Sequence, residues 1–338
     1  MTNSRGLHGR TMRSGWTALD SVWVQGRMKI EAESKAGREV GMENIGLIGT
    51  GIMGNPIARN LLKAGYPLTI YARRENVKEE FRALGAGIAA TPAELAKKCD
   101  ILFLIVNYSR DVKELLYSKD GIVGGAKPGT IIADMTTTDP QFPRETAERL
   151  SKRGIEFLDA PISGGALGAQ NAQLVVMVGG KKEAFEKCLP VLKPISKKVV
   201  YMGPVGSGQT VKLIHNQLSY TTFLAVCEAV ILGERLGLSA NDVIDVFNNG
   251  TARSFATEVR FPKFILNGKF NMGVPFPTAY KDISLARNLR RTTGVHFPIS
   301  SWVYKYMKYC MDRNADQDDL STIFVKMKDI LGKVKSFM

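Results

Sequence analysis

Short apolar runs alternate with amphipathic segments along the chain from Glu43 to about residue 203. The runs have the length and composition of buried strands, and the segments between them have helical periodicity. Strands are predicted at 44–48, 68–71, 100–106, 130–134, 155–159, 173–178 and 198–201, and helices at 53–64, 75–84, 92–98, 109–116, 140–153 and 181–190. This alternation predicts an α/β domain with a doubly wound parallel sheet over residues 43–205.

The pattern changes after Gly206, where strand-like runs stop. Residues 209–236 read as one long helix that is apolar almost all round, so we expect it to lie in a core between other helices. Further helices are predicted at 240–249, 254–265, 278–293, 300–313 and 319–331. Residues 206–332 are therefore predicted to form a separate all-helical domain with a short tail at 333–338. A ligand would sit in the crevice between the two domains.

The first 42 residues show no hydrophobic periodicity and no apolar signal core. We interpret residues 1–42 as a disordered extension or as the product of a start codon placed too early, with Met42 as the true start. A transit peptide is the weaker alternative. No apolar stretch reaches the ~18 residues of a membrane-spanning helix. The four separated cysteines are typical of reduced residues in a cytosolic protein, so a cytoplasmic location is expected.

A glycine-rich turn joins the first predicted strand to the first helix, in Asn44-Ile-Gly-Leu-Ile-Gly-Thr-Gly-Ile-Met-Gly54. Its glycines have the G-x-G-x-x-G spacing of dinucleotide-binding turns. Gly49 permits the tight turn, Gly51 lets a pyrophosphate approach the backbone, and Gly54 lets the helix pack closely on the strand. The helix N-terminus would face the phosphates, and the contacts are predicted at Gly49, Gly51, Ile52, Met53 and Gly54. A plain structural turn is the alternative.

The end of the second strand selects between NAD and NADP in this type of domain, because an acidic residue there binds the ribose 2′-OH and an arginine accommodates a 2′-phosphate. Here the strand is followed by Ala72-Arg73-Arg74, and Glu75 comes too late. Arg73 and Arg74 therefore predict NADP, unless both are surface charges and the protein is indifferent.

Three further stretches carry candidate chemistry. Ser163, Gly164 and Gly165 follow a strand and could hold a carboxylate with a hydroxyl group and successive amides. Lys212 and Asn216 are four residues apart and share a face near the start of the long helix. Burial would lower the pKa of Lys212 and suit it to proton transfer. Lys281, at a helix start, could reach the same crevice.

Composition limits the alternatives. Four separated cysteines predict reduced packing residues, and only three histidines argue against a metal centre built on imidazoles. His215 is interpreted as a packing residue on a different helical face from Lys212. The net charge of +14 is spread along the chain among acidic residues. We interpret it as a solvated basic surface that attracts anionic ligands, and expect neither a nucleic-acid nor a membrane partner.

Together and in this order, the motifs resemble the β-hydroxyacid dehydrogenase family, which includes 3-hydroxyisobutyrate dehydrogenase, tartronate semialdehyde reductase and succinic semialdehyde/glyoxylate reductases. The resemblance covers about residues 44–331. Besides the glycine turn, it rests on Asp134-Met-Thr-Thr, Asp159-Ala-Pro-Ile-Ser-Gly-Gly, Met177-Val-Gly-Gly, the Gly-x-Gly-x-x-x-Lys-x-x-x-Asn of 206–216, and Lys281-Asp-Ile-x-Leu-Ala.

The resemblance implies a Rossmann domain and an all-α C-terminal domain, of the 6-phosphogluconate dehydrogenase type, joined by a long interdomain helix in a homodimer or homotetramer. It implies NADP-dependent interconversion of a short β-hydroxyacid and its semialdehyde. Lys212 would be the general acid/base, Asn216 would position it or the substrate, and Ser163, Gly164 and Gly165 would bind the substrate carboxylate. Lys281 would contact cofactor or substrate, the backbone of Val106 and Asn107 would follow the adenine–ribose path, and Thr136 or Thr137 would lie near the nicotinamide.

The sequence departs from the family pattern at three places. Asn107 stands where proline is frequent, Ala172-Gln173 replaces a frequent Gly-Thr, and His215-Asn216 replaces a common Asn-Asn. Two alternatives remain. One is a non-catalytic NADP-binding scaffold with a basic surface, and the other is an imine-type reductase on the same fold.

Overall fold

The computed structural model describes residues 42–313 and 315–333. The predicted N-terminal extension lies outside the described residues except for Met42, and most of the predicted tail lies outside them too. The four cysteines are all buried and none forms a disulfide.

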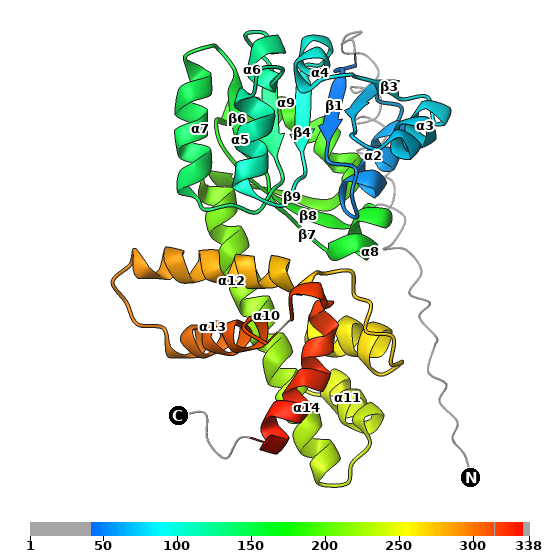
Figure 1. The fold of residues 1–338 in the computed structure, drawn as a ribbon, viewed down its shortest axis with the longest axis vertical. Coiled ribbons are helices and arrows are strands. Elements are labelled where there is room, and N and C mark those ends of the chain that lie inside the picture. Colours follow the sequence, from blue (N-terminus) through cyan, green and yellow to red (C-terminus); the bar gives the residue numbers. More distant parts are fainter. Residues whose placement is uncertain (1–41, 314, 334–338) are drawn as a thin grey trace, which may run out of the picture. The chain divides into compact units, whose positions relative to one another are not determined.

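A nine-stranded sheet forms the first part of the described chain (Figure 1). Its strand order is β3-β2-β1-β4-β5-β6-β8-β7, with β9 paired to β8. The pairs from β3 to β6 are all parallel, which confirms the predicted doubly wound Rossmann arrangement. The strands are β1 (Ile45–Ile48), β2 (Leu68–Tyr71), β3 (Gly87–Ile88), β4 (Ile101–Leu104), β5 (Ile131–Asp134), β6 (Glu156–Asp159), β7 (Ile162–Ser163), β8 (Leu174–Gly179) and β9 (Ser196–Gly203).

The far edge of the sheet differs from the prediction of a purely parallel sheet. Strand β8 runs antiparallel to β6 and to β7, and parallel to β9. Strands β3 and β7 were not predicted, because two residues are too few to show a periodicity. The segment predicted as a substrate loop therefore begins in strand β7 and continues directly into helix α8 (Gly165–Gln170).

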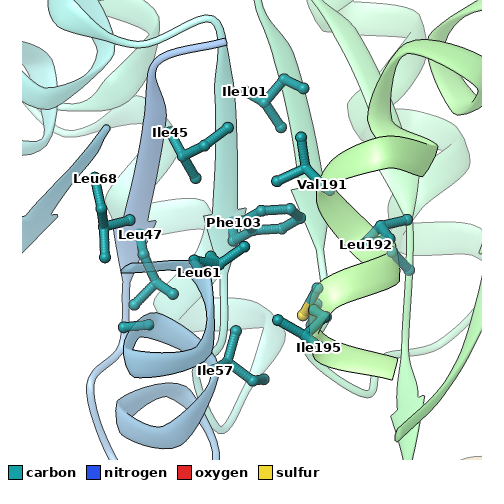
Figure 2. Packing of buried hydrophobic residues seen from close by; sticks show 14 of the residues in the cluster. Ile45, Leu47, Ile57, Leu61, Leu68, Ile101, Phe103, Val191, Leu192 and Ile195 are labelled. Carbon is teal, nitrogen blue, oxygen red and sulfur yellow. The ribbon is translucent and has the colours of Figure 1, made fainter. Parts of the chain in front are cut away.

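Side chains alternate along the central strands and divide the core between two faces of the sheet. Ile45 and Leu47 pack with Phe103 on one face (Figure 2), while Ile48 packs with Leu102 and Leu104 on the other. The first face is covered by α2 (Gly54–Lys63), α3 (Glu75–Ala83) and α9 (Lys182–Leu192), and the second by α4 (Pro92–Lys98), α5 (Ser109–Tyr117), α6 (Ile122–Gly125) and α7 (Gln141–Ser151).

The remaining described residues form helices, as predicted. Helix α10 (Ser207–Arg235) runs from the sheet into a helical core that contains Phe223, Phe261, Phe276 and Phe324. None of the described helices is both long and apolar enough to cross a membrane. The other elements are α11 (Ala240–Asn249), the π-helix η2 (Ala256–Ile265), α12 (Phe276–Arg291), α13 (Pro298–Met311), α14 (Ile323–Lys333) and the short 3-10 turns η1 (Lys193–Ile195), η3 (Ala315–Gln317) and η4 (Leu320–Thr322).

Helix α10 is not buried all round, so that part of the prediction is wrong. Ile214, Leu218 and Leu232 are 58%, 67% and 61% exposed, whereas Leu213, Phe223 and Val230 are buried. An apolar sequence pattern indicates that a helix is buried in part, but it does not show which faces of the helix are covered by neighbouring elements.

The start of α10 is fixed to the sheet by one carboxylate. Asp159, at the end of β6, accepts hydrogen bonds from the amides of Gly206 (2.7 Å) and Gln209 (2.8 Å). These are amides that a helix N-terminus leaves without partners inside the helix. A Cβ on Gly208 would lie 2.5 Å from the carbonyl oxygen of Met177 and 2.8 Å from that of Asp159. Helix and sheet therefore approach so closely that only glycine fits.

Gly208→Ala is expected to destabilise the protein by about 1–3 kcal/mol. The added Cβ would meet backbone carbonyl oxygens, which cannot move aside as a flexible side chain can. Gly124→Ala is the matched control, since nothing lies within 4 Å of its Cβ position. Thermal unfolding of the two variants measures the difference. Equal melting temperatures would show that α10 does not depend on this close approach.

Candidate active site

The glycine turn after β1 has the geometry that a dinucleotide requires. Gly49 has a φ of +102°, and a Cβ there would lie 2.0 Å from the carbonyl oxygen of Ile105. A Cβ on Gly54 would lie 1.9 Å from the carbonyl oxygen of Gly49, so the start of α2 needs glycine there for close packing. Gly51, by contrast, is exposed with nothing within 4 Å of its Cβ position. Open space at this glycine fits a bound pyrophosphate.

The amides of this turn are free to bind an anion. Among the described residues, the backbone N–H groups of Gly51, Ile52 and Met53 donate to no other backbone group. The Ile52 side chain is 58% exposed. Arg73 and Arg74 are both exposed just after β2, beside the turn's own strand β1. The residues present therefore fit a dinucleotide, with two guanidinium groups at the end of the second strand.

The loops after β4 and β5 are tied to each other and to α10. The Val106 amide donates to Thr136 Oγ1 (3.2 Å). Gln209 of α10 donates to the Thr136 carbonyl (2.6 Å) and accepts from the Thr138 amide (3.0 Å). Thr136 is only 2% exposed, so its side chain supports the loop, and Thr137 is the more open of the two threonines predicted near the nicotinamide.

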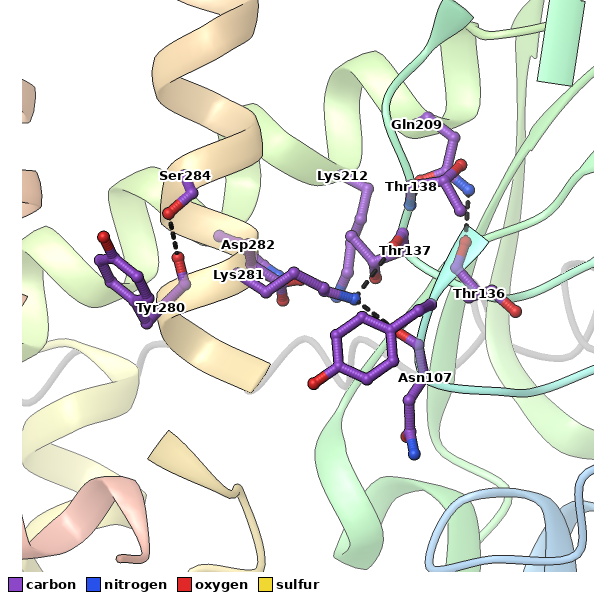
Figure 3. Close-up of polar contacts among 12 residues, drawn as sticks. Asn107, Thr136, Thr137, Thr138, Gln209, Lys212, Tyr280, Lys281, Asp282 and Ser284 are labelled. Carbon is purple, nitrogen blue, oxygen red and sulfur yellow. Dashed lines mark hydrogen bonds and ion pairs between the residues drawn. The ribbon is translucent and has the colours of Figure 1, made fainter. Parts of the chain in front are cut away.

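Lys281 of α12 reaches these same loops (Figure 3). Its Nζ donates to the carbonyl oxygens of Asn107 and Thr137, at 2.9 Å each, and lies 3.3 Å from Asp282 Oδ1. Two of the three donors of this ammonium group are thus used by backbone carbonyls, and Asp282 is close enough to form an ion pair with it. Lys281 thus joins the helical part of the chain to the two loops that border the dinucleotide turn.

Lys212 lies on α10 and is only 8% exposed. Its Nζ donates to the Ile162 carbonyl oxygen (2.6 Å), immediately before Ser163. Burial lowers the pKa of Lys212 to about 8, opposed by the negative charge of Asp282 and reinforced by the positive charge of Lys281. A lysine with a pKa this close to neutrality can both give and take a proton.

Asn216 lies one helical turn after Lys212 and donates to Asp282 Oδ2 (2.7 Å). Asp282 was not among the predicted site residues, although its position in the sequence of α12 is informative. Phe276, Ala279, Ile283 and Ala286 form the buried stripe of α12, and Asp282 lies on that stripe. A carboxylate on a core stripe is unusual unless it is paired. Asp282 therefore orients Asn216 and sets the charge beside Lys212.

His215 was interpreted as a packing residue on a different face from Lys212, and both points are wrong. The two are three positions apart, so they are neighbours on the helix surface. His215 is exposed, and its Nε2 lies 2.8 Å from Ser163 Oγ. Partial desolvation lowers the pKa of His215, and the positive charges of Lys212 and Arg260 lower it further. Ser163, Lys212, His215 and Asn216 are thus brought together.

Gly164 and Gly165 follow Ser163 with φ values of +133° and +63°. Both are exposed, and Gly165 starts α8. Positive φ angles at successive glycines turn neighbouring amides toward one side, which suits an anion. The segment predicted to bind a substrate carboxylate therefore lies beside the ammonium group of Lys212.

One cavity lined by described residues lies away from these groups. Of the cavities bordered by described residues, one of about 320 Å³ is lined by the starts of β1, β4 and β5, including Asn44, Ile101 and Ile131. These are the amino ends of the strands, whereas the glycine turn and Ser163 follow carboxyl ends, where ligands of open α/β sheets bind. This cavity is therefore not the candidate active site.

A dinucleotide turn, exposed arginines after β2 and a buried lysine beside an anion-binding segment define a nicotinamide-dependent oxidoreductase. Comparison with known proteins agrees. Residues 44–203 match the NAD binding domain of 6-phosphogluconate dehydrogenase. Residues 206–326 match the NAD-binding domain of NADP-dependent 3-hydroxyisobutyrate dehydrogenase. The chain belongs to the 3-hydroxyisobutyrate dehydrogenase family of β-hydroxyacid dehydrogenases, and is an NAD(P)-dependent oxidoreductase of that family.

Individual relatives are similar over most of their length. The mitochondrial 3-hydroxyisobutyrate dehydrogenase of Mus musculus is 31% identical over 84% of this chain and 87% of its own. The solved 3-hydroxyisobutyrate dehydrogenase of Mycobacterium tuberculosis with L-serine has a TM-score of 0.76 at 28% identity, covering 85% of this chain and 99% of the other. An imine reductase from Myxococcus stipitatus with NADP+ shares the fold, with a TM-score of 0.57 at 19% identity over 84% of this chain and 99% of its own.

One buried carboxyl group links the site to pH. Asp134, paired in register with Asp159 across β5 and β6, accepts from the Thr136 amide through Oδ1 (2.9 Å). Its Oδ2 has no hydrogen-bond partner in the described part of the chain. Burial raises the pKa of Asp134 from 3.8 to about 7, opposed by the Thr136 contacts and reinforced by the charge of Asp159.

A carboxyl group whose pKa is raised on folding binds an extra proton in the folded state between the two pKa values. The contribution of Asp134 to the free energy of unfolding therefore falls as the pH rises from about 4 to about 7, and is lost above. Asp134→Asn removes this contribution, so its melting temperature should decline less than that of the wild type between about pH 5 and pH 8. Asp120→Asn, which changes an exposed carboxylate, should keep the wild-type slope. Parallel curves for Asp134→Asn and wild type would contradict a neutral Asp134.

Proposed function

We propose that this protein is an NADP-dependent reductase that interconverts a short β-hydroxyacid and its semialdehyde. The observation that carries the proposal is the buried Lys212, with a pKa of about 8, beside the Ser163–Gly165 segment. An anion held by that segment would have its neighbouring carbonyl group within reach of the ammonium.

The bound nicotinamide would supply or accept the hydride. The residues of this chain would handle the proton and the orientation. Lys212, protonated below its pKa, would donate a proton to the developing alkoxide during reduction, and the neutral amine would accept it in the reverse direction. The Ile162 carbonyl holds one N–H of the ammonium and leaves two for other partners. Asn216, held by Asp282, would position the substrate oxygen.

The substrate carboxylate would be bound by the Ser163 hydroxyl group and the amides of Gly164 and Gly165. A carboxylate in this position distinguishes the proposal from imine reduction, which needs no carboxylate clamp. The imine-type alternative is favoured only by the shared fold. The non-catalytic scaffold is disfavoured because Lys212, Asn216 and Lys281 are all present and in contact with partners around one site.

The preference for NADP rests on Arg73 and Arg74. Both side chains are exposed after β2. Guanidinium groups bind a 2′-phosphate through charge-assisted, bidentate hydrogen bonds, which are stronger than the single hydrogen bond that a neutral ribose hydroxyl group can accept. Glu75 begins α3 beyond them, so no carboxylate takes the place that would favour NAD.

The protein's location and oligomeric state can also be proposed. We propose a cytoplasmic location, because the four cysteines are free thiols, and a homodimer or homotetramer, which the family resemblance implies. The exposed apolar side chains of α10, among them Ile214, Leu218 and Leu232, are the kind of surface that association would cover.

Lys212→Ala is expected to lower turnover by roughly 10²–10⁴-fold, the usual worth of general acid–base catalysis, and to leave NADPH affinity near wild type. Lys182→Ala, on the surface, should change neither. In the wild type, kcat/KM for reduction should fall above about pH 8, while kcat/KM for oxidation should rise to a plateau there, because the two directions need opposite forms of the lysine. Stopped assays across pH measure both. Retained turnover in Lys212→Ala would contradict the assigned role.

The double variant Arg73→Ala/Arg74→Ala tests the cofactor. Loss of two charge-assisted contacts should weaken NADP+ binding roughly 10- to 100-fold and leave NAD+ binding almost unchanged. Calorimetric titration with each nucleotide gives both dissociation constants without turnover. Arg82→Ala, an exposed arginine at the end of α3, serves as the control. Equal weakening of the two nucleotides would mean that the arginines do not select between them.

A further inference from the structure

One face of α10 carries basic and polar groups in sequence. Lys212, His215 and Ser219 are spaced by three and four residues, so their side chains follow one another along a single stripe. His215 is bonded to Ser163 through Nε2. Ser219 is bonded to Arg260 of η2, whose Nη2 donates to Ser219 Oγ (2.9 Å) and whose Nη1 donates to the Ser219 carbonyl (3.1 Å). The stripe therefore continues from the proposed catalytic lysine to a guanidinium group.

Arg260 is unusual because it is buried without a counter-ion. It is only 8% exposed. Among the ion pairs of the described residues, none includes Arg260. Its Nε has no hydrogen-bond partner there either.

Aromatic rings surround this guanidinium group. Its Cζ lies 4.9 Å from the ring centroid of Phe223 and 5.6 Å from those of Tyr220 and Phe255. Aromatic faces attract a cation, but more weakly than burial penalises it, and burial lowers the pKa of Arg260. The partners of the buried Arg260 guanidinium group are aromatic rings and Ser219, and no anion pairs with it among the described residues. Of these rings, that of Phe255 is itself 55% exposed.

The charges around the site do not balance. Lys212, Lys281 and Arg260 are positive, and Asp282 is the carboxylate that pairs with Asn216 and Lys281. One substrate carboxylate at the Ser163–Gly165 segment would neutralise only part of the excess. Arg260 also acts on His215 electrostatically, which places it within range of the group that holds Ser163.

We propose that His215 and Arg260 form a subsite for a second anionic group, so that the substrate is a short hydroxyacid or semialdehyde with two carboxylates. The first carboxylate binds at Ser163–Gly165, the reacting carbon lies beside Lys212, and the second carboxylate extends along α10. There it meets the exposed imidazole of His215, with the charge of Arg260 behind it. The inference rests on the proposed function and adds the class of substrate.

The test compares two acids that differ only in this second group. In 3-hydroxy-2-methylpropanoate the branch is a methyl group, and in 2-(hydroxymethyl)butanedioate it is a carboxymethyl group. The wild type should oxidise the diacid with the higher kcat/KM. Arg260→Gln should lower kcat/KM for the diacid roughly 10- to 100-fold and change that for the monoacid little. His215→Asn should shift the ratio in the same direction, and Arg260→Lys should keep part of the preference.

Controls separate binding from folding and from the reaction. Arg235→Gln removes an exposed charge at the far end of the same helix and should leave the ratio unchanged. Melting temperatures show whether each variant folds, and calorimetric titration with each acid measures binding without turnover. Diacid binding that is selectively lost in Arg260→Gln supports the subsite even if neither acid is oxidised, a result that would sink the proposed reaction alone. Equal loss for both acids, or a wild type that prefers the monoacid, overturns the subsite.

Discussion

The carboxylate of Asp159 holds the start of α10 against the end of β6, and the geometry of the site depends on that contact. Its two oxygens accept the amides of Gly206 and Gln209, and the bare backbone of Gly208 allows the approach. Lys212, His215 and Asn216 all follow within ten residues on the same rigid helix. Their positions relative to the sheet are therefore set by a helix cap, with Gln209 adding a second connection to the loop after β5.

A second contact determines where the helical part meets the loops of the sheet. Lys281 donates to two backbone carbonyls from those loops, and its neighbour Asp282 holds Asn216. Adjacent residues on α12 thus act in different places, one on the loops beside the dinucleotide turn and one on the group next to Lys212. If the proposed roles are correct, the loops beside the cofactor and the Asn216 side chain are coupled through one turn of α12.

Much of this could be predicted from the sequence, because the informative signals are local. The βαβ alternation and the spacing of Gly49, Gly51 and Gly54 depend on neighbouring residues, and the sheet from β3 to β6 follows them. The candidate residues Lys212, Asn216 and Ser163 lie within recognisable sequence motifs. The bond between His215 and Ser163 could not be predicted, since it joins residues 52 apart. Nor could the roles of Asp282 and Arg260, which depend on how α12 and η2 pack on α10. The exposure of Leu218 likewise depends on which helices lie nearby.

The acceptors of Lys281 have a consequence for how this protein can vary. Both are main-chain oxygens, of Asn107 and Thr137, and every amino acid supplies such an oxygen. Residues of the two loops can therefore be substituted during evolution, and the loops can acquire new specificities, while the hydrogen bonds from Lys281 of α12 are kept. A different side chain at position 107 would leave this attachment in place, because Lys281 contacts only its main-chain oxygen.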